Sequence, residues 1–175
     1  NQFSDTNPIE EQIDNIYGKW KVEARGDLIF LPHFETPRFA KDDPDFPYHF
    51  LTFQPLTNLN GVGANLALLQ ELSGLYSREY WNTWAEINNE TAAEHGIKEG
   101  DYVNIISLRG RLSVKVKILP TVMPEVIIMP SGRFSKTTDL NPYAIFVEDI
   151  DLITGVPSLI STKVKIEKAK SIKVI

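Results

Sequence analysis

The sequence predicts a mainly β domain with short helices, and residues 84–130 carry most of that prediction. A strand at Trp84–Ile87 runs into an Asn pair that can cap a helix start, and a brief helix at Glu90–His95 stops at Gly96. Two strands with alternating apolar residues then meet at a glycine-containing turn, which is typical of a β-hairpin. These hairpin strands are Tyr102–Leu108 and Leu112–Leu119, and a buried strand at Val126–Met129 follows them.

Residues 1–46 are predicted to be a linker or extended arm, and the domain itself is placed at 47–175. The first part is rich in Pro, Asp and Asn and holds one capped helical patch, Asn7–Tyr17. Four prolines between residues 32 and 47 then exclude regular structure. Two alternatives stay open: a linker that clasps a neighbouring domain, and a simple N-terminal arm.

The first half of the domain should contain a strand, a polar loop and a helix. The strand is expected at Tyr48–Phe53, the loop at Gln54–Gly63 and the helix at Ala64–Ser73. Leucines at helical spacing mark the face of this helix that we expect to lie on the core: Leu66, Leu69, Leu72 and Leu68.

The C-terminal part is predicted as short strands or turns at Tyr143–Val147, Asp149–Leu152 and Ser161–Ile166. Residues 163–175 alternate Lys with Val and Ile. That pattern favours an edge strand whose lysines discourage intermolecular pairing, and a tail that binds lipid or nucleic acid is the alternative.

Composition and charge narrow the classes of function. The net charge of −5 argues against non-specific nucleic-acid binding, which needs an excess of Lys and Arg. No apolar run approaches the roughly 18 residues of a spanning helix, and no signal-peptide pattern starts the chain, so we expect it to be soluble as written. The lack of cysteine excludes disulfides and thiolate ligands to a metal or cluster from this chain.

The loop Asn58–Asn65 is the main candidate binding loop. It lies between a strand and a helix, where glycines let backbone N–H groups approach a phosphate and the helix start adds partial positive charge. Its asparagines offer uncharged donors and acceptors to an aromatic base. A Rossmann fingerprint is excluded because Leu66 stands at the third glycine position. Since Asn and Gly are also ordinary turn residues, a ligand loop and a plain turn both stay open.

Residues 84–130 closely resemble the C-terminal domain of the molybdopterin oxidoreductases of the dimethyl sulfoxide reductase family. The family pattern is a strand, N-P-e-D-A-a-e-l-G-i-k-d-G-d-x-V, a glycine hairpin and a strand ending in Pro. The matching residues are Asn88, Ala92, Gly96, Ile97, Gly100, Asp101, Val103, Gly110 and Pro130. The resemblance extends more weakly to Phe46 and Ile166. It implies a six-stranded double-psi β-barrel of the aspartate-decarboxylase-like type that holds part of a molybdopterin guanine dinucleotide.

The resemblance also implies a set of cofactor-binding residues. Thr52 matches a family Thr, Gln54 stands where Arg is usual, and Asn58 and Asn60 stand where polar His residues often are. The full predicted set is Thr52, Gln54, Asn58, Asn60, Asn65, Arg133 and Asn141. Further departures from the family pattern are Thr91 in place of Asp and Ile160 in place of Lys.

No catalytic or metal-ligating residue is predicted. His33, His49 and His95 lack metal-ligand spacing, and His95 sits at a helix C-terminus, where a cation is favoured electrostatically. No serine or carboxylate lies in a nucleophile or paired-acid context. We therefore expect the chain alone to have no activity.

The sequence therefore predicts a cofactor-clasping domain of a molybdopterin oxidoreductase subunit that contributes to electron transfer within a larger enzyme. The resemblance is greatest to subunits of membrane quinone-linked complexes in anaerobic respiration. It implies the remaining domains of the parent enzyme as partners, with iron–sulfur and membrane subunits as further candidates, and the periplasmic side of the membrane for the complex. The alternatives are a cofactor-free structural barrel in such a complex and a protein-binding double-psi barrel.

Overall fold

The fold is taken from a computed structural model that describes residues 39, 43–58, 61–132, 140–150 and 155–169. The chain divides into two compact units. The barrel lies in the larger one, and the smaller falls almost entirely outside the described residues, so the predicted boundary at residue 46 stays a prediction. Among the described helices, none has the length and apolar character needed to cross a bilayer.

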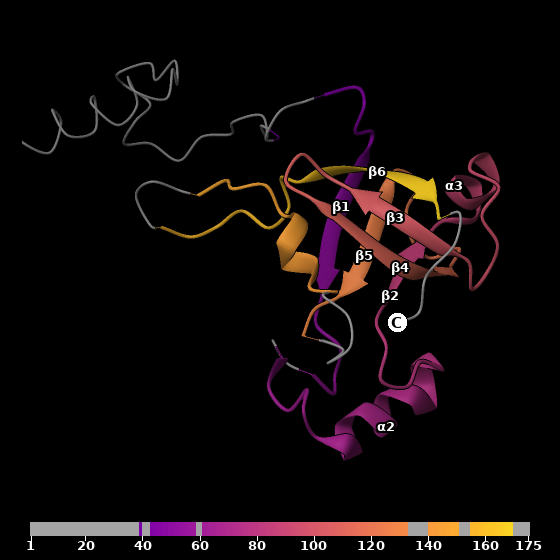
Figure 1. The fold of residues 1–175 in the computed structure, drawn as a ribbon, viewed down its shortest axis with the longest axis vertical. Coiled ribbons are helices and arrows are strands. Elements are labelled where there is room, and N and C mark those ends of the chain that lie inside the picture. The colour runs from indigo at the N-terminus through magenta and orange to yellow at the C-terminus, as the bar shows by residue number, and fades with distance from the viewer. Residues whose placement is uncertain (1–38, 40–42, 59–60, 133–139, 151–154, 170–175) are drawn as a thin grey trace, which may run out of the picture. The chain divides into compact units, whose positions relative to one another are not determined.

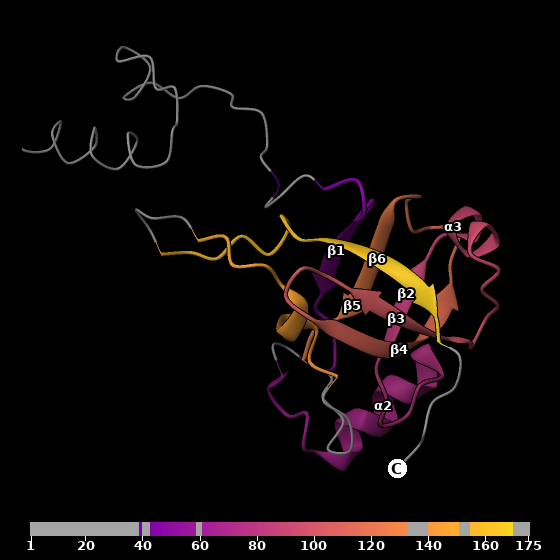
Figure 2. The ribbon, with the colours of Figure 1, turned by 45° about the horizontal axis from the view of Figure 1, so that its top comes forward.

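Six strands close into a barrel in the order β1-β5-β2-β4-β3-β6 (Figures 1 and 2). The predicted fold class, a mainly β six-stranded double-psi barrel, is confirmed, and the predictions for the six barrel strands agree with the observed strands to within two residues at each end. Tyr143–Val147, predicted as a short strand or turn, instead contains most of a 3₁₀ helix, and Asp149–Leu152 lies partly outside the described residues. The strands are β1 (Tyr48–Phe53), β2 (Trp84–Ile87), β3 (Tyr102–Ile106), β4 (Arg111–Ile118), β5 (Val126–Pro130) and β6 (Lys163–Lys168).

The pairing of the strands has an internal twofold symmetry. β1 pairs in parallel with β5, β2 pairs in parallel with β4, and the other neighbours are antiparallel. Exchanging β1 with β4, β2 with β5 and β3 with β6 leaves every pairing unchanged. Because β1 and β5 run in the same direction, the loops that follow them leave the barrel at the same end.

The core fills the barrel from alternate positions of each strand. In β4, for example, Leu112, Val114 and Val116 are buried, whereas Arg111 and Ser113 are exposed. The side chains with no solvent exposure include Phe50, Ile87, Val103, Ile105, Val114, Val116, Ile127, Met129, Ile145 and Val164.

The prediction of an edge strand over 163–175 is wrong for its described part. β6 pairs with β1 on one side and with β3 on the other. Val164 and Ile166 point into the core, so the intervening lysines lie on the outer surface of a closed barrel. Sequence alternation identifies the buried face of a strand, but it does not show whether a second neighbour covers its edge.

Short helix α3 (Asn89–Glu94) buries Thr91 and Ala92 and is capped as expected. The Asn88 side-chain Oδ1 accepts a hydrogen bond from the Glu90 backbone N–H at 2.8 Å, and its Nδ2 donates to the Val122 carbonyl at 2.6 Å. Asn88 therefore joins the helix start to the loop between β4 and β5.

Replacing Asn88 with alanine is expected to lower the free energy of unfolding by about 2 kcal/mol, because both the cap and the bond to a buried carbonyl are lost. Asn88→Ser is the matched control: a serine hydroxyl can still cap the helix start but cannot reach the Val122 carbonyl, so only one of the two contacts is lost and the loss should be smaller. Urea denaturation of both variants checks this. An alanine variant as stable as the serine variant would contradict it.

Helix α2 (Ala67–Ser77) forms three residues later than predicted, and the prediction of its core face is wrong. Leu66 precedes the helix, Leu68 and Leu72 are exposed, and Leu69 is only half-buried. The buried positions of the helix are instead the polar Gln70 and Ser73 together with Gly74. Leucines at this spacing predict a core face because an isolated domain normally buries the apolar stripe of a helix.

Candidate functional site

Two loops meet at the end of the barrel where β1 and β5 finish. The Ser131 backbone N–H donates to the Phe53 carbonyl at 2.7 Å, which ties the exits of the two strands together. One residue later, Gly132 has φ +76°, and a Cβ added there would lie 2.2 Å from the Gly61 nitrogen and 3.0 Å from the Asn58 carbonyl oxygen. We call this contact of residues 58 and 61 with Gly132 the loop junction.

Asn58 is fully buried beside the loop junction. Its Oδ1 accepts hydrogen bonds from the Thr57 hydroxyl at 3.0 Å and the Ser73 hydroxyl at 3.2 Å, whereas its Nδ2 has no hydrogen-bond partner among the residues that the structure describes. A buried donor without a partner costs about 1–3 kcal/mol. An amide held at that cost, on a loop where two segments converge, is suited to donate to a ligand.

The surroundings of the loop junction suit an anionic or neutral ligand. Residues 54–66 contain no charged side chain. The helix that follows, α2, has no side-chain cap and no acidic residue in its first turn, so no carboxylate there competes for its partial positive charge.

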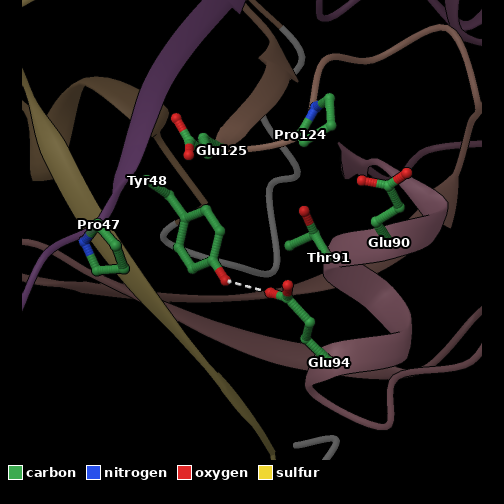
Figure 3. Close-up of a pocket in the computed structure, with 7 residues that line it drawn as sticks. All are labelled: Pro47, Tyr48, Glu90, Thr91, Glu94, Pro124 and Glu125. Atoms are coloured by element: carbon green, nitrogen blue, oxygen red, sulfur yellow. Dashed lines mark hydrogen bonds between the residues drawn. The ribbon is translucent and has the colours of Figure 1, made fainter.

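A hollow lies at the other end of the β1 and β5 pair, where these strands begin, and its lining is acidic (Figure 3). Its volume is about 330 Å³, and its lining includes Glu90, Glu94 and Glu125. The Tyr48 hydroxyl donates to the Glu94 carboxylate at 3.4 Å and lies 2.7 Å from His95 Nε2. Burial, and then the charge of Glu94, raises the pKa of Tyr48. Three carboxylates would repel a phosphate, so this hollow is not suited to a dinucleotide.

Comparison with known proteins identifies the family of the domain. A family model described as the molydopterin dinucleotide binding domain matches residues 50–163. The chain belongs to this family. The match supports the predicted molybdopterin guanine dinucleotide cofactor.

Relatives of this dinucleotide-binding domain are parts of larger subunits. The chain is 29% identical to the arsenate respiratory reductase molybdopterin-containing subunit of Chrysiogenes arsenatis, over 90% of this chain and 21% of that protein. It is 26% identical to dimethyl sulfoxide reductase DmsA of Escherichia coli K12, over 71% of this chain and 15% of that protein. The chain thus spans about a fifth or less of these curated relatives, which implies further domains in the parent enzyme.

A solved structure shares the fold of the dinucleotide-binding domain. Acetylene hydratase from Pelobacter acetylenicus superposes with a TM-score of 0.65 at 18% identity, over 88% of this chain and 22% of that one. At that identity the likeness concerns the fold alone.

The predicted binding residues of this molybdopterin dinucleotide domain differ in their burial and in whether the structure describes them. Thr52 is half-buried on β1, and Gln54 and Asn65 are exposed in the following loop. Asn141 is exposed and caps the 3₁₀ helix η2 (Pro142–Ile145), where its Oδ1 accepts from the Tyr143 N–H at 3.0 Å. Asn60 and Arg133 lie outside the described residues.

Asn58 is the predicted residue that the structure brings against the second segment, through the loop junction. In both views η2 lies beside the lower half of β1, on the side toward which that strand ends (Figures 1 and 2). The convergence of the whole set at one mouth stays a prediction.

Three residues at the site were missed by reasoning from the sequence: Thr57, Ser73 and Gly132. The two hydroxyls hold the Asn58 amide, and Gly132 allows the loops to touch. A signal existed for Gly132, because it follows a buried strand end at the point where a second loop must pass. Ser73 could have been noticed as a small polar residue that interrupts a run of leucines.

Proposed function

We propose that this domain clasps the dinucleotide part of a molybdopterin guanine dinucleotide at the loop junction, as one part of a larger oxidoreductase. The observation that carries the proposal is the fully buried Asn58 amide at the point where the two loops touch, whose Nδ2 has no hydrogen-bond partner within the described part of the chain. The family match supplies the class of ligand.

The roles of the residues follow from their chemistry. Asn58 donates from Nδ2 to an acceptor on the base or the phosphates, with Thr57 and Ser73 fixing the orientation of its amide. The uncapped start of α2 and the nearby Asn65 face the anionic part of the ligand. Thr52, Gln54, Asn60, Arg133 and Asn141 complete the enclosure.

When bound, the cofactor supplies the metal that exchanges electrons with the substrate of the enzyme. This chain contributes orientation and exclusion of water, which is how a protein normally serves a redox cofactor. Electron transfer then depends on the remaining domains and on partner subunits, for which iron–sulfur and membrane proteins are the candidates.

Titration of the chain with a guanine nucleotide, followed by NMR chemical shifts, tests the proposal. We expect weak binding, with a dissociation constant above roughly 0.1 mM, because a single domain encloses only part of the ligand. Shifts should cluster on the Asn58 side-chain amide, Asn65 and Gly132, and the residues of the acidic hollow serve as the internal control. Saturating nucleotide without a response at the loop junction would instead favour a cofactor-free or protein-binding barrel.

A further inference from the structure

Helix α2 presents its apolar side to solvent and its polar side to the domain. At about 100° per residue, positions 68, 72 and 75 share one side of the helix, and positions 70 and 73 lie on the other. Leu68, Leu72 and Leu75 are 69%, 39% and 74% exposed. We call these three residues the leucine face. Gln70 and Ser73, on the opposite side, are almost fully buried.

Hydrogen bonds fix this orientation of α2. Gln70 Nε2 donates to the Ala64 carbonyl at 2.8 Å, and the Ser73 hydroxyl lies within hydrogen-bonding distance of Asn58 and the Thr57 hydroxyl. Lys117 Nζ, which lies 4.2 Å from the centroid of the Trp84 ring, donates to the carbonyl of Ser77 at the end of the helix. Rolling the leucines inward would break these contacts, so the leucine face is a stable feature of the domain.

Two aromatic residues extend the exposed apolar surface. The Tyr80 ring packs so closely on Gly74 that a Cβ there would be 2.1 Å from it, and yet Tyr80 is 46% exposed. Trp81 is 45% exposed, has φ +59°, and donates from Nε1 to Glu71 at 3.0 Å. A tryptophan held at the surface in a left-handed backbone conformation is unusual, and Trp and Tyr are enriched at protein interfaces.

We propose that the leucine face, with Tyr80 and Trp81, docks against an apolar surface of another domain of the parent oxidoreductase. The inference rests on the proposed function, since it takes the chain to be one domain of a larger enzyme. The arsenate respiratory reductase subunit of Chrysiogenes arsenatis is nearly five times as long as the part that this chain matches, so a parent protein of similar size would contain other domains to dock against. Glu71 is the single charged residue of α2, and it is bonded to Trp81, so the surface lacks the charged character of a solvated face.

Docking on α2 would also complete the cofactor site. The buried side of α2 bonds to Asn58, so a domain that covers the outer side of α2 would close the same end of the barrel as the loop junction. The second domain would thus enclose the ligand that this chain alone leaves open.

Cysteine labelling tests the proposal, because the chain contains no cysteine of its own. Leu75→Cys and Leu68→Cys report on the leucine face, and Met123→Cys, at a residue 71% exposed between β4 and β5, is the matched control. In the isolated chain all three should react with a maleimide at similar rates. The same substitutions are then placed in the assembled oxidoreductase, and labelling is followed by peptide mass spectrometry. There, Leu75→Cys and Leu68→Cys should react at least ten-fold more slowly than in the isolated chain, while the labelling rate of Met123→Cys is unchanged.

Three results of the labelling experiment would overturn the docking proposal. Equal rates in the assembled enzyme mean that the face stays open. Labelling of the isolated chain that becomes slower as the protein concentration rises means that a second copy covers the face. Slow labelling that does not depend on concentration means that the chain covers its own face. The pterin and guanine nucleotide released from the same enzyme preparation are measured separately. Protected cysteines in an enzyme without cofactor would refute the proposed function alone. Bound cofactor together with unprotected cysteines would refute the docking alone.

Discussion

Replacing Gly132 with alanine is expected to destabilise the domain by about 3 kcal/mol or more, because two effects add. The residue has φ +76°, which is strained for alanine, and the new Cβ would lie 2.2 Å from the Gly61 nitrogen and 2.9 Å from its Cα. These are backbone atoms, so the loops must separate to admit a methyl group. The free energy of unfolding from urea denaturation measures the loss.

Gly96→Ala is the matched control for the Gly132 variant. Gly96 has a similar left-handed φ of +60°, and a Cβ there meets nothing within 4 Å. The Gly96→Ala variant should therefore be destabilised only by backbone strain, by about 1 kcal/mol. Equal losses in the two variants would mean that the loop junction is not held closed. If the cofactor binds there, the assembled enzyme carrying Gly132→Ala should also lose most of its pterin.

The strands of the barrel could be predicted from the sequence because their signals are local. Alternating apolar residues, a glycine turn at Gly110 and an Asn cap at Asn88 each depend on a few neighbouring positions, and the structure has the corresponding elements. The closure of the barrel depends on residues far apart in the chain. β6 pairs with β1 and β3, and nothing within 163–168 itself distinguishes that arrangement from an edge strand.

Helix α2 shows a different reason for failure. Its leucine spacing correctly indicated an amphipathic helix, but the apolar stripe does not face the core of this domain. The pattern records that a face is apolar, and the tertiary contacts of Gln70 and Ser73 decide which way it points. An apolar stripe and the surface that covers it can lie in different domains.

The binding loop could be located from the sequence, but the roles of its residues could not be assigned. The three asparagines of the loop were equivalent by composition, whereas the structure buries Asn58 completely and leaves Asn65 exposed. The partners that orient the Asn58 amide include Ser73, fifteen positions further along the chain. The burial of a side chain and its hydrogen-bond partners are set only when the chain folds. These two properties distinguish an asparagine amide fixed in place for a ligand from an asparagine that only forms a turn.

Replacing Asn58 with aspartate is expected to destabilise the domain strongly at neutral pH and much less in acid. The substitution keeps the oxygen that accepts from Thr57 and Ser73 but puts a second carboxylate oxygen, with its negative charge, in place of Nδ2 in a fully buried site. Burial should raise the pKa of the new carboxyl above its unfolded value. Below the pKa of the unfolded state, near 4, the carboxyl is protonated in both states and the free energy of unfolding is not reduced by its ionisation. The free energy of unfolding then falls as the pH rises from there through the higher pKa of the folded state.

The measurement is the free energy of unfolding of Asn58→Asp between about pH 4 and 7, relative to the parent chain, and the deficit should grow by about 3 kcal/mol over that range. Ser73→Ala is the matched control: it removes a hydroxyl bonded to Asn58 without adding charge, so its loss should be about 1 kcal/mol and independent of pH. In the assembled enzyme the aspartate should also repel the phosphates of the cofactor and lower the bound pterin at least ten-fold, while Ser73→Ala retains most of it. A deficit that does not change with pH would show that position 58 is open to water, and full pterin content in the aspartate variant would show that Nδ2 does not serve the ligand.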